Sequence, residues 1–220
     1  MNRYLVFISL VFLVFSLSCN KDDDKAEGIE YTVTFTFNWN SLDFPEDYPS
    51  NAHFSKLIGW NHLPTSDFFE LGTLASEGIE VMAETGSITP LDSEINAKIV
   101  NGEGINLYVD DPLSSGTGSV SLNIIVDSEF SSVTLVSMIA PSPDWYVGVV
   151  NFNLLENGEF VQEKIVKALV YDSGTDSGVT FTSGNIDTSP KEPITLFTDH
   201  PLGDGEGISP AIATVKFTKQ

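Results

Sequence analysis

The sequence predicts an all-β fold: an antiparallel β-sandwich of about eight strands with one or two short helices. Two observations predict it. Apolar residues alternate with polar ones along several segments of strand length, and clusters of Gly, Pro, Asn and Asp separate these segments. No repeat with a period of about 20–50 residues is present. After an N-terminal leader and a charged tether roughly 190 residues remain, which suits one sandwich better than two domains.

The strand predictions follow the alternation. The clearest strand covers residues 31–39, where an aromatic residue or Val at every second position alternates with Thr or Asn. A nearly continuous apolar run at 133–139 predicts a central strand that is buried on both faces. The other segments predicted as strands are 105–109, 119–126, 145–155, 163–170, 179–182 and 211–218.

Helical signals are short and few. The segment 67–84 can begin at Ser66 or Asp67 as an N-cap, but Gly72 and Gly78 interrupt it, so we expect two brief turns. Farther along, apolar residues at 91, 95 and 99 lie between Pro90 and Gly102 and predict one amphipathic helix of about ten residues. The segments 187–193 and 200–210 are rich in Pro or Gly and are predicted as long loops at the ends of the sandwich.

Residues 1–18 have the pattern of a lipoprotein signal peptide. Arg3 precedes an apolar run of about 14 residues, which is too short to span a bilayer and has the length of a secretory signal. Cys19, the only cysteine, ends this run and is predicted to carry the lipid anchor. Ser16 stands where such signals usually carry Leu, and an ordinary signal peptide with an incidental Cys is the alternative.

Residues 19–29 are predicted to form an acidic tether, because three consecutive Asp residues between two Lys residues contain nothing that a core could bury. The tether also resembles the acidic export signal of surface-displayed lipoproteins in Bacteroidetes-type bacteria. We therefore expect an outer membrane lipoprotein at the cell surface, with retention on the periplasmic side as the open alternative. The folded domain is predicted to cover residues 30–220.

The charge excludes one class of function. The net charge of −21 becomes −22 once the leader is removed, because residues 1–18 hold Arg3 and no acid. The remaining chain has 9 lysines against 31 acids and no arginine to clamp a phosphate or read a base edge. Nucleic-acid binding is therefore not expected. An acidic surface instead suits divalent cations.

Two acidic segments form a candidate metal site. Asp144 lies between prolines and an aromatic pair in PSPDWYVG (141–148), while Asp172 and Asp176 lie in YDSGTDSG (171–178). The prolines fix φ near the first carboxylate, and the glycines allow the second segment to fold tightly. Three carboxylates without a nearby His or Cys favour a hard cation, and Ca²⁺ suits this set better than Mg²⁺. The alternative is that these Asp residues only cap turns through Asx hydrogen bonds.

The same two segments resemble the spondin N-terminal domain family. Three more stretches match its pattern in the right order, and the resemblance covers roughly residues 31–218. The family is similar in fold to synaptotagmin-type sandwiches, which hold calcium in loops at one end. The resemblance implies that Asp144, Asp172 and Asp176 are the calcium carboxylates. The upstream stretches are HFSKLIG (53–59), LG (71–72) with ASEG (75–78), and AETG (83–86).

Other side chains that could bind a ligand or catalyse a reaction have simpler, structural interpretations. Trp145 begins an alternating strand, so we expect it in the core rather than in a ligand-stacking platform. His53 and His62 form no zinc-type pair and are interpreted as structural. Glu77 and Glu84 are expected to accept hydrogen bonds from backbone donors in a buried turn rather than to form a glycosidase pair. No nucleophile elbow, P-loop or dinucleotide motif is present, and no catalytic residue is predicted.

The sequence thus predicts a non-enzymatic, calcium-binding adhesion or ligand-binding module, held to a membrane by the lipid on Cys19. The resemblance also implies a setting, because in animal members of the spondin N-terminal domain family this domain belongs to secreted, matrix-associated proteins. The expected partner is an extracellular protein or glycan. Two alternatives stay open: a surface glycan hydrolase that uses Asp144, Asp172 or Glu84, and a passive sandwich that calcium only stabilises.

Overall fold

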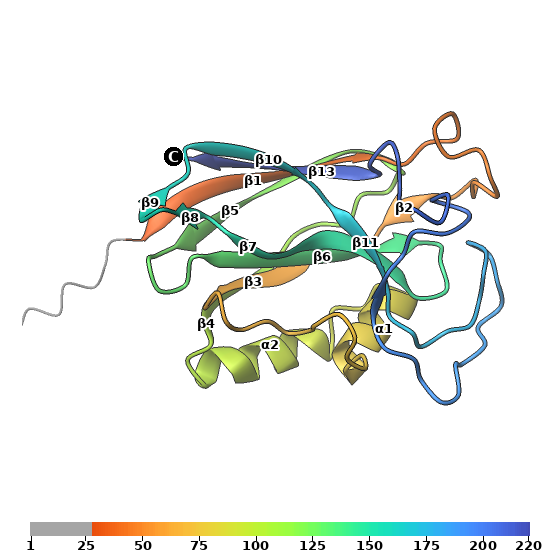
Figure 1. The fold of residues 1–220 in the computed structure, drawn as a ribbon, viewed down its shortest axis with the longest axis horizontal. Coiled ribbons are helices and arrows are strands. Elements are labelled where there is room, and N and C mark those ends of the chain that lie inside the picture. Colours follow the sequence, from red (N-terminus) through yellow and green to blue (C-terminus); the bar gives the residue numbers. More distant parts are fainter. Residues whose placement is uncertain (1–27) are drawn as a thin grey trace, which may run out of the picture.

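The computed structural model describes residues 28–220 and consists of two antiparallel sheets packed face to face, with two helices on one side (Figure 1). The all-β sandwich prediction is therefore confirmed. One sheet has four strands in the order β10 (Glu163–Lys167), β13 (Ala213–Lys219), β1 (Ile29–Asn38) and β5 (Thr117–Val126).

The larger sheet runs in the order β12 (Thr195–Leu196), β11 (Leu169–Asp172), β7 (Trp145–Asn153), β6 (Ser132–Ala140), β3 (Ile58–His62) and β4 (Gly104–Val109). A short strand, β2 (His53–Phe54), also pairs with β6. The strands β8 (Leu155–Glu156) and β9 (Glu159–Phe160) form a separate hairpin.

The alternation in β1 has the predicted physical cause. Its apolar side chains are buried between the sheets, whereas its threonines face outward and bond to the neighbouring strand, as Thr34 Oγ1 does to Ser121 Oγ at 2.8 Å. Aromatic rings fill the space between the sheets, with the ring centroids of Phe37 and Phe54 4.1 Å apart. Burial of this apolar face is the main stabilising contribution to the sandwich.

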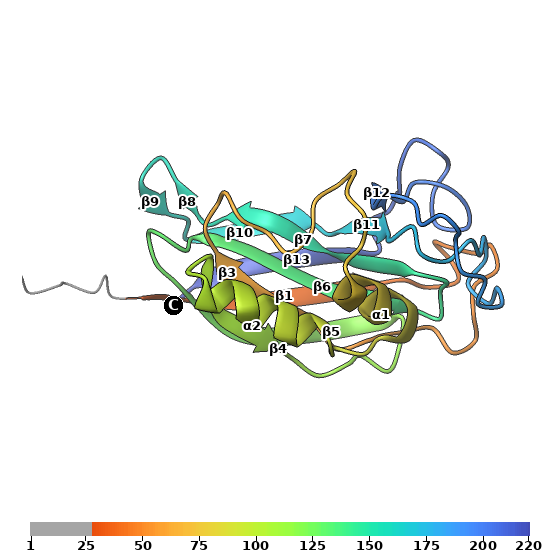
Figure 2. The same cartoon turned by 90° about the horizontal axis from the view of Figure 1, so that it is seen from below.

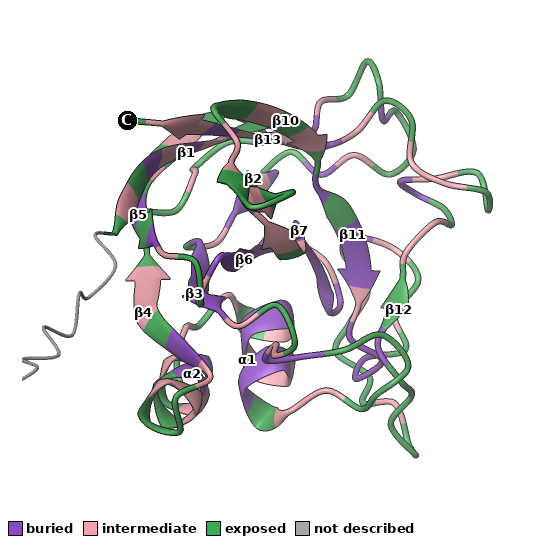
Figure 3. Cartoon of the chain, turned by 60° about the vertical axis from the view of Figure 1, so that its left-hand side comes forward, coloured by how far each residue is buried: buried purple, intermediate pink, exposed green. Residues whose placement is uncertain are grey.

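The helices α1 (Glu77–Thr85) and α2 (Leu91–Val100) form a third layer on the outer face of the larger sheet (Figure 2). Ile79 and Met82 of α1 and Ile95 of α2 join the apolar cluster that covers this face, which includes Val136 and Met138 of β6. Every residue of β6 is consequently buried, as the continuous apolar run at 133–139 predicted (Figure 3). The helix predicted around residues 91–99 is α2.

The expectation of two brief turns in 67–84 was wrong, because residues 77–85 form one helix. Ser76 caps its N-terminus by accepting a hydrogen bond from Ile79 N at 3.2 Å. Gly78 is tolerated in the first turn and lets the second helix come close: a Cβ on it would lie 2.6 Å from the Cα of Leu91. The sequence signal for this helix is weak because the packing contact requires a glycine, which has a low helix propensity.

Two strand predictions also need correction. The segment 163–170 divides at Ala168 into β10 and β11, which belong to different sheets. Residues 179–182 form no strand: Val179 is exposed, and Ser183 Oγ accepts hydrogen bonds from Val179 N and Thr180 N in a turn. Only Phe181 enters the core there. Within residues 28–220 no helix is both long and apolar enough to cross a membrane.

Candidate functional site

The candidate site lies at the end of the sandwich opposite the start of β1, where the β6–β7 loop meets the segment that follows β11 (Figure 1). Asp144 directly precedes β7, and Asp172 is the last residue of β11. These two strands pair antiparallel with Asp172 opposite Trp145. The pairing therefore brings two of the predicted carboxylates into one neighbourhood although they are far apart in the sequence.

Asp144 is fully buried and organises the second acidic segment. Its Oδ2 accepts hydrogen bonds from Thr175 N at 2.8 Å, from Asp176 N at 3.1 Å and from Ser173 Oγ at 2.9 Å. Its Oδ1 is equally buried and has no hydrogen-bond partner within residues 28–220. A buried carboxylate oxygen without a partner is costly, so this atom needs an explanation other than capping a turn.

Asp172 is half-buried beside Asp144. Its Oδ1 accepts a hydrogen bond from Gly174 N at 2.8 Å, which is the Asx contact that the sequence left open as an alternative. Burial, and then the negative charge of Asp144, raise the pKa of Asp172 to about 6. Gly174 has φ of +72°, and a Cβ on it would lie 2.3 Å from Glu192 O, so only glycine fits this turn.

Asp176 holds the far side of the loop. Its Oδ1 accepts from Gly178 N at 2.7 Å, and its Oδ2 accepts from Ile186 N at 3.1 Å. Its exposed fraction is only 6%, so this carboxylate too lies close to the protein interior. All three predicted metal-binding residues thus lie in one cluster, and each already accepts hydrogen bonds from the loop that it holds.

Comparison with known proteins places these residues in a family. The Spondin_N family model matches residues 29–204, a span that contains all three aspartates. Spondin-2 of Rattus norvegicus is 34% identical over 172 residues, which cover 76% of this chain and 52% of that protein. Spondin-2 of Homo sapiens is 34% identical over 173 residues, covering 77% and 52%. Spondin-1 of Rattus norvegicus is 34% identical over 182 residues, covering 78% and 22%.

The chain belongs to the spondin N-terminal domain family. The sequence resemblance is therefore confirmed. The chain spans about half the length of the Spondin-2 relatives and about a fifth of the Spondin-1 relatives that it matches.

The spondin domain places a fourth carboxylate, that of Glu84, near Asp144 and Asp176. Glu84, in the last turn of α1, faces Thr175, and burial followed by the charges of Glu80, Asp176 and Asp144 raises its pKa. Glu77 is exposed at the opposite end of the same helix. These two glutamates thus lie on a helix rather than in the buried turn expected from the sequence. The AETG motif was visible, but its position next to Thr175 depends on the packing of α1 on the larger sheet.

The carboxylates do not form a closed metal cage. Among residues 28–220, no group of three or more His, Cys, Asp or Glu side chains is arranged to hold an ion as it stands. The donor set nevertheless fits a hard cation in its chemistry, because the oxygens of Asp144, Asp172 and Asp176 are joined by the hydroxyls of Ser173 and Thr175, which lie 2.6 Å apart. Each carboxylate oxygen that accepts one hydrogen bond retains a lone pair.

The remaining predicted residues have structural surroundings. Trp145 is in the core, with its ring centroid 4.2 Å from that of Phe197. His62 is buried and bonds to Thr134 Oγ1 at 3.0 Å, and burial lowers its pKa to about 4. His53 Nδ1 lies 2.7 Å from Asn51 O. The leader 1–18 and Cys19 lie outside the described residues, as does the tether up to residue 27.

Proposed function

We propose that this spondin domain is a calcium-binding, non-enzymatic adhesion or ligand-binding module, anchored to a bacterial outer membrane through Cys19. The observation that carries the calcium proposal is the oxygen Asp144 Oδ1, which is buried without a partner next to Asp172. A cation at this oxygen would satisfy it and would offset both the burial of Asp172 and the charge of Asp144, which raise the pKa of Asp172.

The chemistry of the donors supports calcium over other ions. All candidate ligands are oxygens, from Asp144, Asp172, Asp176 and the hydroxyl of Thr175, and no His or Cys side chain belongs to this hydrogen-bonded cluster. Calcium accepts about six to eight oxygens in irregular geometry, whereas magnesium requires a near-octahedral shell and retains more water. Main-chain carbonyls and water would complete the shell around calcium.

The position of the site supports a role in recognition. The chain enters the sandwich at one end through β1, and the acidic loops lie at the other end (Figure 1). An anchor at Cys19 would attach to the domain at the β1 end, which leaves these loops at the other end for a partner. Calcium bound there would rigidify the loops and reduce their negative charge, so that the end of the sandwich can meet an extracellular protein or an anionic glycan.

Burial argues against the hydrolase alternative. A glycosidase acid or nucleophile must touch the sugar, and Asp144 has no exposed surface. Burial therefore excludes Asp144 as the residue that touches a sugar, and we propose that its carboxylate binds an ion instead.

The experiment is calorimetric and thermal titration of the protein from residue 20 onward after treatment with a chelator. Extracellular calcium modules bind with Kd on the order of 10⁻⁴–10⁻³ M, so about 10 mM CaCl₂ should stabilise the fold by about 1.4–2.7 kcal/mol. For a domain of this size this raises Tm by about 3–10 °C. Magnesium at the same concentration should have a smaller effect.

A matched control is Glu129→Gln, which removes one exposed carboxylate at the opposite end of the sandwich and should leave the calcium response intact. Absence of both calcium binding and a calcium-dependent rise in Tm would contradict the ion proposal.

The recognition proposal is tested separately by probing arrays of glycans and matrix proteins with and without EDTA. Turnover of a glycan that depends on one of the carboxylates would overturn the non-enzymatic assignment.

A further inference from the structure

The strand β10 leaves one edge of the four-stranded sheet open. On its other side β10 pairs with β13, which bonds to every second residue of this segment. Lys219 N donates to Gln162 O at 3.0 Å, and Ala168 N donates to Ala213 O at 3.0 Å. Because the bonding side alternates along a strand, Glu163, Ile165 and Lys167 direct their N–H and C=O groups away from β13. Within residues 28–220 no other strand pairs with this edge.

The side chains of the same three residues form a self-complementary row. Glu163, Ile165 and Lys167 all lie on the outer face of the sheet and are exposed, with 60% of Ile165 accessible. An acid, an apolar residue and a base thus follow one another at a spacing of two residues. A row of this kind matches its own copy when the copy runs in the opposite direction.

We propose that two copies of this chain associate through antiparallel pairing of their β10 strands, centred on Ile165. In this register Ile165 faces Ile165 of the second copy, and Glu163 faces Lys167 of the second copy on both sides of the two-fold axis. The three facing pairs would exchange about six backbone hydrogen bonds. The two four-stranded sheets then become one continuous sheet of eight strands, and the β10 edge of each copy is covered.

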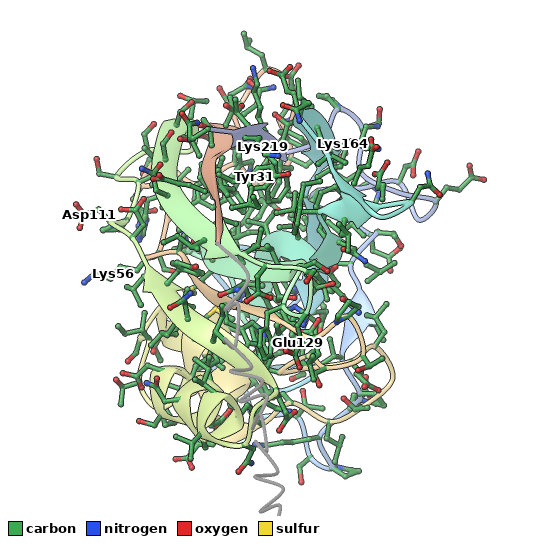
Figure 4. The ribbon with its side chains drawn as sticks, turned by 90° about the vertical axis from the view of Figure 1, so that its left-hand side faces the viewer. Tyr31, Lys56, Asp111, Glu129, Lys164 and Lys219 are labelled. Atoms are coloured by element: carbon green, nitrogen blue, oxygen red, sulfur yellow. The ribbon has the colours of Figure 1, made fainter. Side chains whose placement is uncertain are left out.

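The charge distribution favours this edge. Seven lysines lie in residues 28–220, and four of them are on β10 and β13. Two of the four, Lys164 and Lys219, lie close together near the start of β1 (Figure 4). Lys167 has no ion-pair partner within the described part of the chain, and Glu163 bonds to Lys216 at 2.8 Å. In a chain of net charge −21, two copies repel each other least where the cations gather.

The opposite edge of the same sheet, β5, lacks these features. By the same alternation Ser119, Ser121 and Asn123 direct their peptide groups outward there, and none of them is charged. The peptide groups of Ile125 are already occupied, because Tyr108 Oη accepts from Ile125 N at 2.9 Å and donates to Ile125 O at 3.1 Å. Self-pairing at β5 would gain no charge pair, so β5 provides an internal control.

The first test is sedimentation equilibrium of the protein from residue 20 onward, between about 10 µM and 1 mM, which should show a reversible monomer–dimer equilibrium. Ile165→Pro removes an N–H that points away from β13 and the exposed Ile165 side chain, so the fold should be retained while dimerisation weakens by at least about tenfold. Ser121→Pro makes the same change at the β5 edge and should leave the dimer intact. Circular dichroism checks that both variants are folded.

The second test uses charge reversal and does not depend on proline. Glu163→Lys and Lys167→Glu should each weaken self-association by about tenfold or more, because like charges then face each other. An equimolar mixture of these two variants should form a heterodimer, since every acid again faces a base. Monomers at all concentrations, a dimer that Ser121→Pro disrupts, or no recovery on mixing would overturn the proposal. The pairing does not depend on calcium, and it would present two candidate sites on one particle.

Discussion

Substitution of Asp144 by Asn and by Ala separates the two roles that the site assigns to this residue. Asp144 Oδ2 accepts hydrogen bonds from two backbone N–H groups and the Ser173 hydroxyl, with the Thr175 hydroxyl farther away at 3.3 Å, whereas Oδ1 has no partner among residues 28–220. An Asn side chain has the same shape and retains one carbonyl oxygen for the three donors. An Ala side chain retains none. The first change therefore removes the charge and puts an amide NH₂ in the place of Oδ1, and the second also removes the support of the loop.

The magnitudes follow from the burial of the donors. Each buried donor that loses a charged acceptor costs about 1–3 kcal/mol, and three donors that relax partly should together cost about 3–5 kcal/mol in Asp144→Ala. This is a large fraction of the 5–15 kcal/mol typical of a domain. Asp144→Asn should stay within about 1 kcal/mol of the unchanged protein without calcium, because it keeps the acceptor for the loop, and the removal of a buried charge offsets the burial of its NH₂ group.

The assay is urea denaturation of the three proteins, each with EDTA and with 10 mM CaCl₂ (about ten or more times the expected Kd). Asp144→Ala should lower the free energy of unfolding in both conditions. Asp144→Asn should match the unchanged protein in EDTA and lose the additional stability that calcium gives. The same calcium increment in Asp144→Asn as in the unchanged protein would refute the reasoning, and so would equal destabilisation by both substitutions in EDTA.

Three further outcomes are expected. Calcium affinity, measured by calorimetric titration, should fall about tenfold between pH 7 and pH 5. The pKa of Asp172 is raised to about 6, and its protonated form does not bind the ion. An unchanged affinity would exclude Asp172 as a ligand. Burial raises the pKa of Asp67 to about 7, so ionisation of Asp67 should lower the free energy of unfolding by about 1 kcal/mol between pH 6.5 and 8.5. Asp67→Asn should remove that decrease, and an identical pH slope in both proteins would contradict it. Gly174→Ala should destabilise the domain by about 1–3 kcal/mol, because of the positive φ and the close Glu192 carbonyl. Gly184→Ala, in open space, should have little effect in the same denaturation assay.

The sequence predicted the strands whose pattern of apolar residues directly shows how many of their faces are buried. Alternation in β1 reports burial of one side, and the apolar run of β6 reports burial of both. The strand β3 was missed because all five of its residues are buried, including Asn61 and His62, so that no alternation appears. The boundary at Ala168 was missed because the residues on both sides keep a strand-like pattern while the chain crosses from one sheet to the other.

The candidate site was predictable in composition but not in connectivity. The family motifs identified Asp144, Asp172 and Asp176, and the structure places them in one cluster. The sequence could not show that Asp144 Oδ2 supports Thr175 and Asp176 from about 30 positions away, because that contact depends on the pairing of β7 with β11. The approach of Glu84 depends in the same way on how α1 packs.

The identity of residue 144 is itself an argument for an ion. If the only role of this side chain were to accept hydrogen bonds from the 173–176 loop, Asn would meet the same donors without placing a charge at a position that has no exposed surface. Burial of the carboxylate is made more costly by the nearby Asp172, whose pKa is raised first by its own burial and then by the negative charge of Asp144. A binding role accounts for this arrangement, because the same charge that is unfavourable in the isolated domain provides the affinity for a divalent cation. The turn-capping alternative explains Oδ2 of Asp144 and leaves Oδ1 without a reason.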